Sequence, residues 1–185
     1  NAGTSSLAGK QCHQNLFVTS YQNDQNHEVL GKYAQNKGYK RVMLLAPNYQ
    51  AGKDSLAGFK LMFKGPVTGE NYTKLGQLDY AAELAQLRAS KPDALYIFLP
   101  GGMGVNFIKQ FVASGMSKDV QLVVPLWGSD QDIIRAVGER LDLLLFPIPL
   151  ADGALTVFVV VRDAQVGLVL ARPGEVLYRA DEDGV

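Results

Sequence analysis

Four short apolar segments recur at nearly constant spacing along this chain of 185 residues. They begin at residues 41, 67, 94 and 120, which are 26, 27 and 26 positions apart, and each gap contains apolar residues at helical spacing. Strands that alternate with helices in this way form βαβ units, in which right-handed crossovers join parallel strands. We therefore expect an α/β fold with a parallel sheet over residues 40–138, doubly wound by helices into a three-layer sandwich.

The segment from Asp93 to Phe111 shows this pattern most clearly. Its first part, Ala94–Leu99, is a continuous apolar run, which is typical of a strand covered on both faces. We expect it to be the most buried strand of the sheet. Pro100, Gly101 and Gly102 then end the strand. A helix is predicted to follow, with an inward stripe made of Val105, Ile108, Phe111 and Val112.

The order of the strands decides which loops meet. In the common order 2-1-3-4-5, the strand at 41 lies beside the strand at 94, and the topological switch point falls between them. The loops 47–52 and 100–104 would then border one crevice at the carboxyl edge of the sheet. Open α/β sheets bind their ligands at this kind of place.

Other elements are predicted from weaker signals. Residues 15–19 are apolar enough for a short strand. Asn23 or Asp24 can cap a helix that Gly38 ends. A further short helix is expected from about residue 130 to residue 137.

Composition changes sharply near residue 133. Residues 133–185 contain no Lys, Asn or Ser, although the first 132 residues contain 11 Lys and 8 Asn. Links too short for helices join three apolar runs in this part, which predicts an antiparallel meander. The runs are 155–161, 166–170 and 175–178. We therefore divide the chain into an α/β lobe, residues 1–138, and an atypical β-rich tail, residues 139–185.

The totals argue against several classes of function. Lys and Arg (18) balance Asp and Glu (18), so the net charge is zero, which argues against a nucleic-acid partner or a membrane surface. The single cysteine, Cys12, excludes an internal disulfide and a cysteine metal cage. No apolar run reaches the roughly 18 residues of a transmembrane helix, so we expect no membrane-embedded segment.

No arrangement typical of catalysis or of a metal site emerges from the sequence. His13 and His27 have no carboxylate or cysteine at ligand spacing, and we predict both as surface residues. Asp54, Asp79 and Glu83 are predicted to cap helices or to face solvent. The G-G-M-G turn lacks the G-x-G-x-x-G spacing and the Lys-Ser/Thr of a P-loop. We expect no catalytic residue, no metal and no cofactor.

Three segments carry a family resemblance. They read L-A-G-K-Q-C-H-Q-N-L-F, Y-K-R-V-M-L-L-A-P-N-Y-Q-A-G-K-D-S-L-A-G-F-K and K-P-D-A-L-Y-I-F-L-P-G-G-M-G-V-N-F-I-K-Q. Through them, Leu7 to about Gly138 resembles the second lobe of type I periplasmic binding proteins, above all the branched-chain amino acid and aromatic-acid receptors of ABC importers.

The resemblance implies a periplasmic receptor whose two lobes close on a solute, an amino acid or an aromatic carboxylate, and deliver it to an ABC transporter permease. The family's first lobe has no counterpart in this sequence, and no resemblance extends beyond Gly138. We therefore expect an isolated lobe followed by a tail of unrelated origin, and a shifted reading frame is one hypothesis for that tail.

The resemblance also indicates which residues would contact the solute. Tyr49 matches the position whose ring lines the cleft, although a half-exposed turn tyrosine would fit the same pattern. Backbone N–H groups of Gly101, Gly102 and Met103, at a helix start, could hold a carboxylate, although a plain turn uses the same glycines. The remaining predicted contacts in these two loops are Asn48 and Pro100.

Trp127 is the last predicted contact. It stands where the amino-acid receptors carry an acid that pairs with the ligand's ammonium group. The nearest acid here, Asp130, could equally cap a helix. Because a buried ammonium needs a charged partner, the tryptophan favours an aromatic acid or another carboxylate without an α-ammonium group.

Two other functions remain open at this point. A small Rossmann-like enzyme or a ligand-sensing regulatory domain could use the same crevice, but an enzyme would need a base or a nucleophile near Tyr49 and Gly101. A defective fragment that keeps its fold without activity is the third reading. The sequence favours solute recognition without chemistry.

Overall fold

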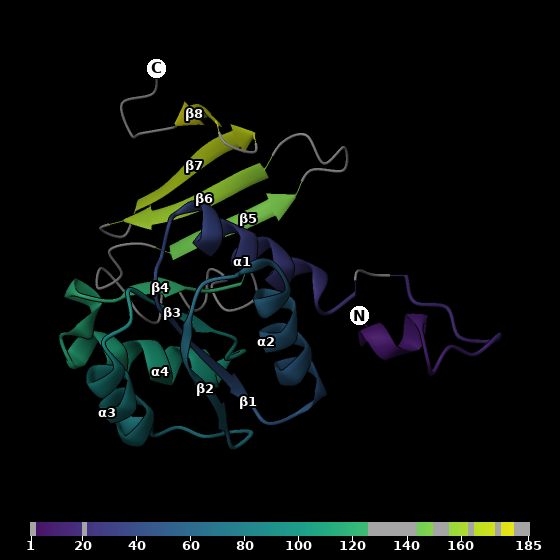
Figure 1. The fold of residues 1–185 in the computed structure, drawn as a ribbon, viewed down its shortest axis with the longest axis horizontal. Coiled ribbons are helices and arrows are strands. Elements are labelled where there is room, and N and C mark those ends of the chain that lie inside the picture. The colour runs from purple at the N-terminus through teal and green to yellow at the C-terminus, as the bar shows by residue number, and fades with distance from the viewer. Residues whose placement is uncertain are drawn as a thin grey trace.

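The central sheet contains four parallel strands in the order β2-β1-β3-β4 (Figure 1). The computed structural model describes residues 3–19 and 22–125, together with the backbones of four strands between residues 144 and 179. The parallel pairing of β1 with both β2 and β3 confirms the predicted sheet and strand order. The strands are β1 (Val42–Pro47), β2 (Val67–Thr73), β3 (Ala94–Ile97) and β4 (Gln121–Val123).

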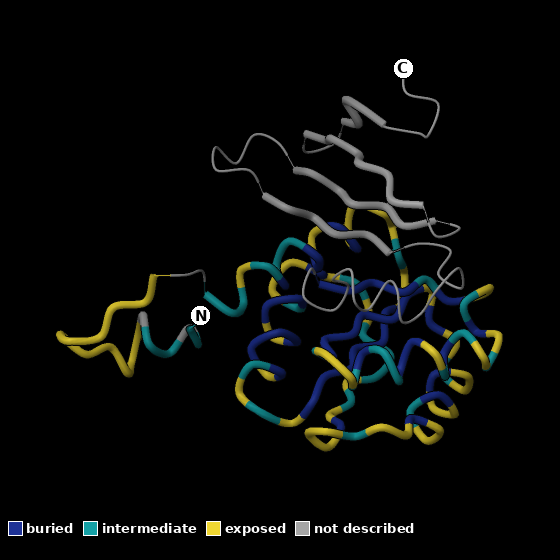
Figure 2. Tube along the Cα trace, turned by 180° about the vertical axis from the view of Figure 1, so that it is seen from behind, coloured by how far each residue is buried: buried dark blue, intermediate teal, exposed yellow. Residues whose placement is uncertain are grey.

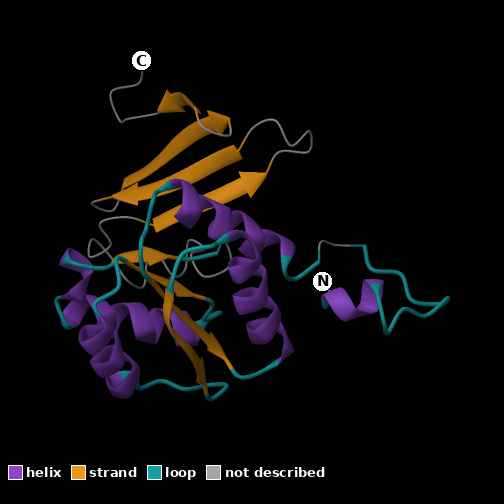
Figure 3. Cartoon of the chain, viewed as in Figure 1, coloured by secondary structure: helices purple, strands orange, loops and turns teal. Residues whose placement is uncertain are grey.

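Helices cover both faces of this sheet (Figure 3). α1 (Gln25–Asn36) and α2 (Gln50–Met62) pack on one face, and α3 (Ala81–Ser90) and α4 (Gly102–Ala113) pack on the other. This division follows from right-handed crossovers, because the chain moves outward from β1 to β2 and then returns past β1 to β3. The reversal confirms the doubly wound sandwich and puts the topological switch point between β1 and β3.

Side chains of β1 and β3 alternate between two hydrophobic clusters. Met43 and Leu95 belong to the cluster on the α3/α4 face, whereas Leu44 and Tyr96 belong to the cluster on the α1/α2 face. None of these four side chains is more than 2% exposed. Burial on both faces explains why these strands are continuous apolar runs in the sequence. Ala94–Leu99 is fully buried as predicted, but β1 is buried equally, so the expectation that one strand would be the most buried is wrong.

α1 and α2 approach each other so closely that their contact requires glycine. A Cβ atom on Gly31 would lie 2.1 Å from the carbonyl oxygen of Phe59, and one on Gly58 would lie 2.5 Å from the carbonyl oxygen of Asp24. Neither distance leaves room for a side chain in a close-packed interior. Each glycine therefore faces the backbone at the other side of the contact, and the short separation of the two helices depends on both.

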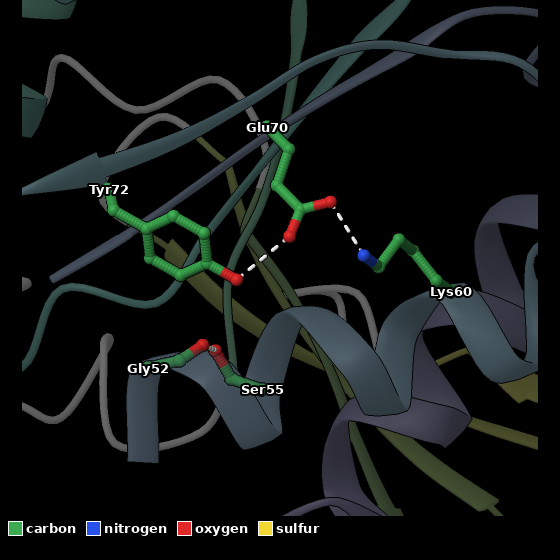
Figure 4. A network of polar contacts seen from close by, with 5 residues as sticks. All are labelled: Gly52, Ser55, Lys60, Glu70 and Tyr72. Carbon is green, nitrogen blue, oxygen red and sulfur yellow. Dashed lines mark hydrogen bonds and ion pairs between the residues drawn. The ribbon is translucent and has the colours of Figure 1, made fainter. Parts of the chain in front are cut away.

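Polar side chains connect α2 to the outer strand β2 (Figure 4). Lys60 Nζ lies 2.6 Å from Glu70 Oε2, and the hydroxyl of Tyr72 donates to Glu70 Oε1 at 2.7 Å. Near the start of α2, the Ser55 hydroxyl donates to the Gly52 carbonyl at 2.7 Å. Because the ion pair is partly exposed, it stabilises the fold by no more than about 1 kcal/mol. The parallel pairing with β1 from Val67 to Thr73 holds β2 in place.

α1 agrees with its prediction, whereas the buried stripe of α4 differs from its prediction in detail. α1 ends where predicted, followed by Gly38 with φ of 74°. In α4 the buried stripe includes Phe107, which is 1% exposed, while Val105 and Val112 are only partly buried. The stripe is therefore rotated slightly from the predicted one, because Gly104 and Phe107 both face the sheet. A 3-10 helix, η2 (Met116–Lys118), follows α4.

The predicted strand at 15–19 is wrong. After the 3-10 helix η1 (Ser5–Ala8), residues 9–19 form an exposed arm, in which Phe17 is 83% exposed. Figure 2 shows this arm standing apart from the buried sheet. Its apolar side chains favour extended backbone, but a strand needs a neighbour for its N–H and C=O groups. Within the described residues the arm pairs with no strand, and a single bridge joins Gly3 to Gln22.

The tail contains the antiparallel meander that the sequence predicts. Its strands pair in the order β5-β6-β7-β8 and are antiparallel throughout. They are β5 (Leu144–Pro149), which was not predicted, β6 (Thr156–Arg162), β7 (Gln165–Arg172) and β8 (Glu175–Arg179). The predicted helix at 130–137 lies outside the described residues, and the division at residue 138 stays a prediction.

Candidate functional site

The first predicted loop begins where β1 ends. Asn48 is exposed, and its backbone N–H donates to the carbonyl of Thr73 at 2.8 Å, so the loop stays tied to β2. Tyr49 is partly buried and has an extended backbone, and α2 starts directly after it. A Cβ atom on Gly52 would lie 2.0 Å from the carbonyl oxygen of Pro47. Glycine therefore lets the first turn of α2 fold back against the end of β1.

The second predicted loop follows β3. Pro100 is partly buried, whereas Gly101 and Gly102 are exposed, and α4 begins at Gly102. The sulfur of Met103 accepts the backbone N–H of Gly76 at 3.2 Å, so this side chain leans toward the loop after β2. The first N–H groups of α4 have no partners within the helix and lie at the positive end of its dipole.

The two loops share the carboxyl edge of the sheet because β1 and β3 are parallel neighbours. Leu45 pairs with Ile97 in register, a few residues before each loop. Six of the seven predicted contacts therefore belong to loops at one edge of the sheet. The seventh, Trp127, lies outside the described residues. Contact of any of them with a ligand stays a prediction.

Gly101→Ala should lower the free energy of unfolding by about 1–3 kcal/mol, the range for holding a residue in a forbidden backbone region. Gly101 has φ of 61° and ψ of −137°, a conformation open essentially to glycine alone. Gly102→Ala is the matched control, because Gly102 is helical and a Cβ atom there meets nothing within 4 Å. Urea unfolding of both variants checks this, and equal stability of the two would contradict it.

The ring of Tyr49 stacks on the buried ring of Phe98. The Phe98 ring lies parallel to the Tyr49 ring, with a centroid distance of 6.3 Å and an interplanar angle of 16°. Phe98 is 7% exposed, and its backbone N–H donates to the carbonyl of Leu45 at 2.9 Å. Burial raises the pKa of the Tyr49 phenol. The ring of Tyr49 thus packs against the core through Phe98, while the residue stays partly exposed.

His27 is not the surface residue that the sequence predicted. It is 2% exposed, its Nδ1 lies 2.6 Å from the hydroxyl oxygen of Tyr96, and its ring meets Phe98 edge-on. It lies near the candidate site because α1 runs antiparallel to β1, which brings the start of the helix to the carboxyl edge. The sequence held a signal for this, since His27 shares the helical stripe of Leu30, Gly31 and Ala34.

The prediction for Asp54 is also wrong. Its side chain is buried and accepts hydrogen bonds from Gln50 Nε2 at 2.7 Å and from Asn23 Nδ2 at 3.3 Å. Burial lowers the pKa of His27 to about 4, and the nearby charge of Asp54 partly offsets that effect. Asp54 therefore belongs to a buried polar cluster that includes His27. The sequence did not reveal this burial, because a short acidic residue near the start of a helix usually caps the helix.

The other two acids behave closer to expectation. Asp79 is exposed and so faces solvent, one of its two predicted roles. Its Oδ1 accepts the backbone N–H of Ala81 at 3.1 Å, but the N-cap of α3 is Tyr80. Glu83 lies in the first turn of α3, partly buried, and accepts a hydrogen bond from Gln77 at 2.8 Å. Both residues support the α3 terminus rather than the edge where β1 and β3 end.

Within residues 3–19 and 22–125 the structure shows no group of three or more His, Cys, Asp or Glu side chains that could hold a metal ion. Cys12 is exposed on the N-terminal arm. No helix in the described part of the chain is long and apolar enough to cross a membrane.

A sequence model of the family described as periplasmic binding protein matches residues 2–154. The chain belongs to this family. Among its curated relatives, the Leu/Ile/Val-binding protein homolog 6 of Brucella melitensis is 28% identical over 163 residues, which cover 85% of this chain and 39% of the relative. The chain thus spans about two fifths of the length of the curated periplasmic binding proteins that it matches.

Solved periplasmic binding proteins share the fold. A solute-binding protein of an ABC transporter from R. palustris, in complex with benzoate, is 27% identical with a TM-score of 0.74, over 81% of this chain and 42% of that one. A second protein from R. palustris, in complex with 4-hydroxybenzoate, is 26% identical with a TM-score of 0.72, over 80% and 41%. A third, from Rhodopseudomonas palustris BisB5 in complex with 3,4-dihydroxybenzoic acid, is 30% identical with a TM-score of 0.65, over 73% and 40%. The family resemblance drawn from the sequence is confirmed. The match continues to residue 154, however, so the prediction that no resemblance extends beyond Gly138 is wrong.

Proposed function

We propose that this chain is the second lobe of a solute receptor that serves an ABC importer and binds an aromatic carboxylate. The observation that carries the proposal is that Tyr49 and the Gly101–Gly102 start of α4 follow neighbouring parallel strands, β1 and β3, at the switch point of the sheet. The partner would be the importer's permease, and the place of action the periplasm. Membership of a family of binding proteins supports a receptor rather than the alternative, a small Rossmann-like enzyme or regulatory domain.

The two loops offer complementary chemistry. The first N–H groups of α4 would donate to a carboxylate, which the positive end of the helix dipole also attracts. The Tyr49 ring, held by Phe98, would provide a flat apolar surface for the aromatic ring of the ligand, with its hydroxyl free to donate. Benzoates combine these two features in one small molecule, and three similar structures hold benzoates.

A branched-chain amino acid is the second candidate, because the curated relatives are named as Leu/Ile/Val-binding homologues. Its α-ammonium group would need an acidic partner once it is buried. Asp54 is the acid closest in sequence to the Tyr49 loop, and it is buried with both oxygens already hydrogen-bonded. This arrangement favours a ligand without an ammonium group.

Affinity should depend on a second lobe. One lobe offers about half of the contacts, and half of a micromolar binding free energy of about 8 kcal/mol corresponds to roughly millimolar affinity. Closure of two lobes would bury the solute on both sides and exclude water. This chain alone is therefore expected to bind benzoate weakly or not at all, and to convert no solute chemically.

In a receptor that carries both lobes, Tyr49→Ala should weaken benzoate binding by about 1–3 kcal/mol, because it removes an aromatic surface and a hydroxyl contact. A bulky residue at Gly102 should weaken binding by obstructing the start of α4. Isothermal titration calorimetry measures both effects. Tyr39→Ala is the control, since Tyr39 precedes β1 and lies at the opposite edge of the sheet. Unchanged affinity in the Tyr49 and Gly102 variants would place the site elsewhere.

A further inference from the structure

His27 is buried at the start of α1. It is the third residue of the helix, on the face that packs against the sheet, and is 2% exposed. The close contact of α1 with α2, which depends on Gly31 and Gly58, holds this end of the helix against the core. The imidazole is therefore packed in place and has little freedom to turn.

The imidazole of His27 contacts Tyr96 of β3 and Phe98, which directly follows β3. Both residues belong to the cluster on the α1/α2 face. Nδ1 lies 2.6 Å from the hydroxyl oxygen of Tyr96, which anchors one edge of the imidazole. Tyr96 is itself fully buried and stacks on Phe59 of α2, with ring centroids 4.5 Å apart. The hydrogen bond therefore joins α1 to a rigid part of the sheet.

The same imidazole also meets Phe98 edge-on. The ring centroids are 5.2 Å apart and the planes cross at 73°. Phe98 in turn stacks in parallel on Tyr49, with centroids 6.3 Å apart. A continuous series of ring contacts thus runs from the Tyr96 hydroxyl, through His27 and Phe98, to the partly exposed ring of Tyr49.

We propose that His27 is a positioning residue for the ligand site: anchored by Tyr96, it fixes the ring of Phe98, and through Phe98 it fixes the ring of Tyr49. This inference rests on the proposed function, in which Tyr49 contacts the ligand. His27 itself touches no ligand. Its effect on binding is to keep one orientation of the Tyr49 ring populated before the ligand arrives, which lowers the cost of ordering that ring.

The test uses the 185-residue chain with ¹³C-labelled tyrosine and nuclear magnetic resonance, with the Tyr49 ring signal assigned by Tyr49→Phe. His27→Ala should shift and broaden the Tyr49 ring signal without any ligand, because Phe98 loses its edge contact. In a receptor that carries both lobes, calorimetric titration with benzoate should show an affinity weakened by about fivefold, within the range for coupled residues in contact. Phe98→Leu, a milder change, should produce the same two effects and serves if His27→Ala does not fold.

Leu87→Ala is the matched control. Leu87 is 1% exposed and belongs to the cluster on the α3/α4 face, whereas Phe98 belongs to the cluster on the α1/α2 face. Leu87→Ala should destabilise the lobe and leave the Tyr49 signal where it is. The inference is overturned if the His27 and Phe98 variants change the Tyr49 signal no more than Leu87→Ala does. If the unsubstituted receptor with both lobes binds no benzoate, the proposed function fails, while the ligand-free spectra of the 185-residue chain still decide the role of His27.

Discussion

Gly31→Ala should lower the free energy of unfolding by about 3 kcal/mol, although alanine is favoured over glycine in a helix by about 1 kcal/mol. The added methyl group would lie 2.1 Å from the carbonyl oxygen of Phe59. That atom belongs to the backbone of α2 and cannot move aside as the end of a flexible side chain can. α1 and α2 must therefore separate, and the cavity that opens between them costs further free energy.

Urea unfolding measures this loss, with Gly102→Ala as the control for adding a methyl group to a helical glycine. Gly102→Ala should be neutral or slightly stabilising, since nothing lies within 4 Å of its added Cβ atom. A loss below about 1 kcal/mol in Gly31→Ala, in the range of ordinary surface changes, would show that the two helices separate easily. The close approach of α1 and α2 would then not determine where His27 lies.

Acidification from pH 6.5 to pH 4 should lower the stability of the lobe by about 3 kcal/mol through His27 alone, since each unit of pKa difference is worth about 1.4 kcal/mol. Burial lowers the pKa of His27 from 6.5 to about 4 in the folded state, and Asp54 partly offsets that effect. Above pH 6.5 the imidazole is neutral in both states. Between pH 6.5 and 4 the unfolded chain binds a proton that the folded chain does not, so stability falls as the pH falls. Below pH 4 both states are protonated, and this group adds no further change.

His27→Asn isolates this effect. Asparagine does not titrate, and its amide can still reach the Tyr96 hydroxyl that Nδ1 contacts. Other groups also titrate in this range, among them Glu28, whose pKa is raised by burial and by Asp24. Subtracting the stability profile of His27→Asn from that of the native protein removes the contribution of these other groups. Urea unfolding at several pH values should give a slope for the native protein that is absent from His27→Asn, and parallel profiles would refute the assignment.

The sequence alone predicted the parts of this fold that local pattern decides. A strand buried on both faces must be apolar at every position, and Ala94–Leu99 shows this directly. Regular alternation with helices then leaves few topologies, because crossovers are right-handed. The common strand order 2-1-3-4-5 then placed β1 beside β3, and with it the loops of Tyr49 and Gly101 at one edge of the sheet, and the structure has this pairing. The family resemblance rested on the same segments.

Long-range contacts decided the rest, since no periodicity reports on them. Residues 15–19 are apolar enough for a strand, but a strand also needs a neighbour, and none of the described strands lies beside them. The inward stripe of α1 placed His27 on a buried face, yet a polar residue is buried only where a partner awaits it. That partner, Tyr96, is 69 residues away. Only the tertiary structure brings it within hydrogen-bond distance of His27, and with it sets the aromatic rings beneath Tyr49.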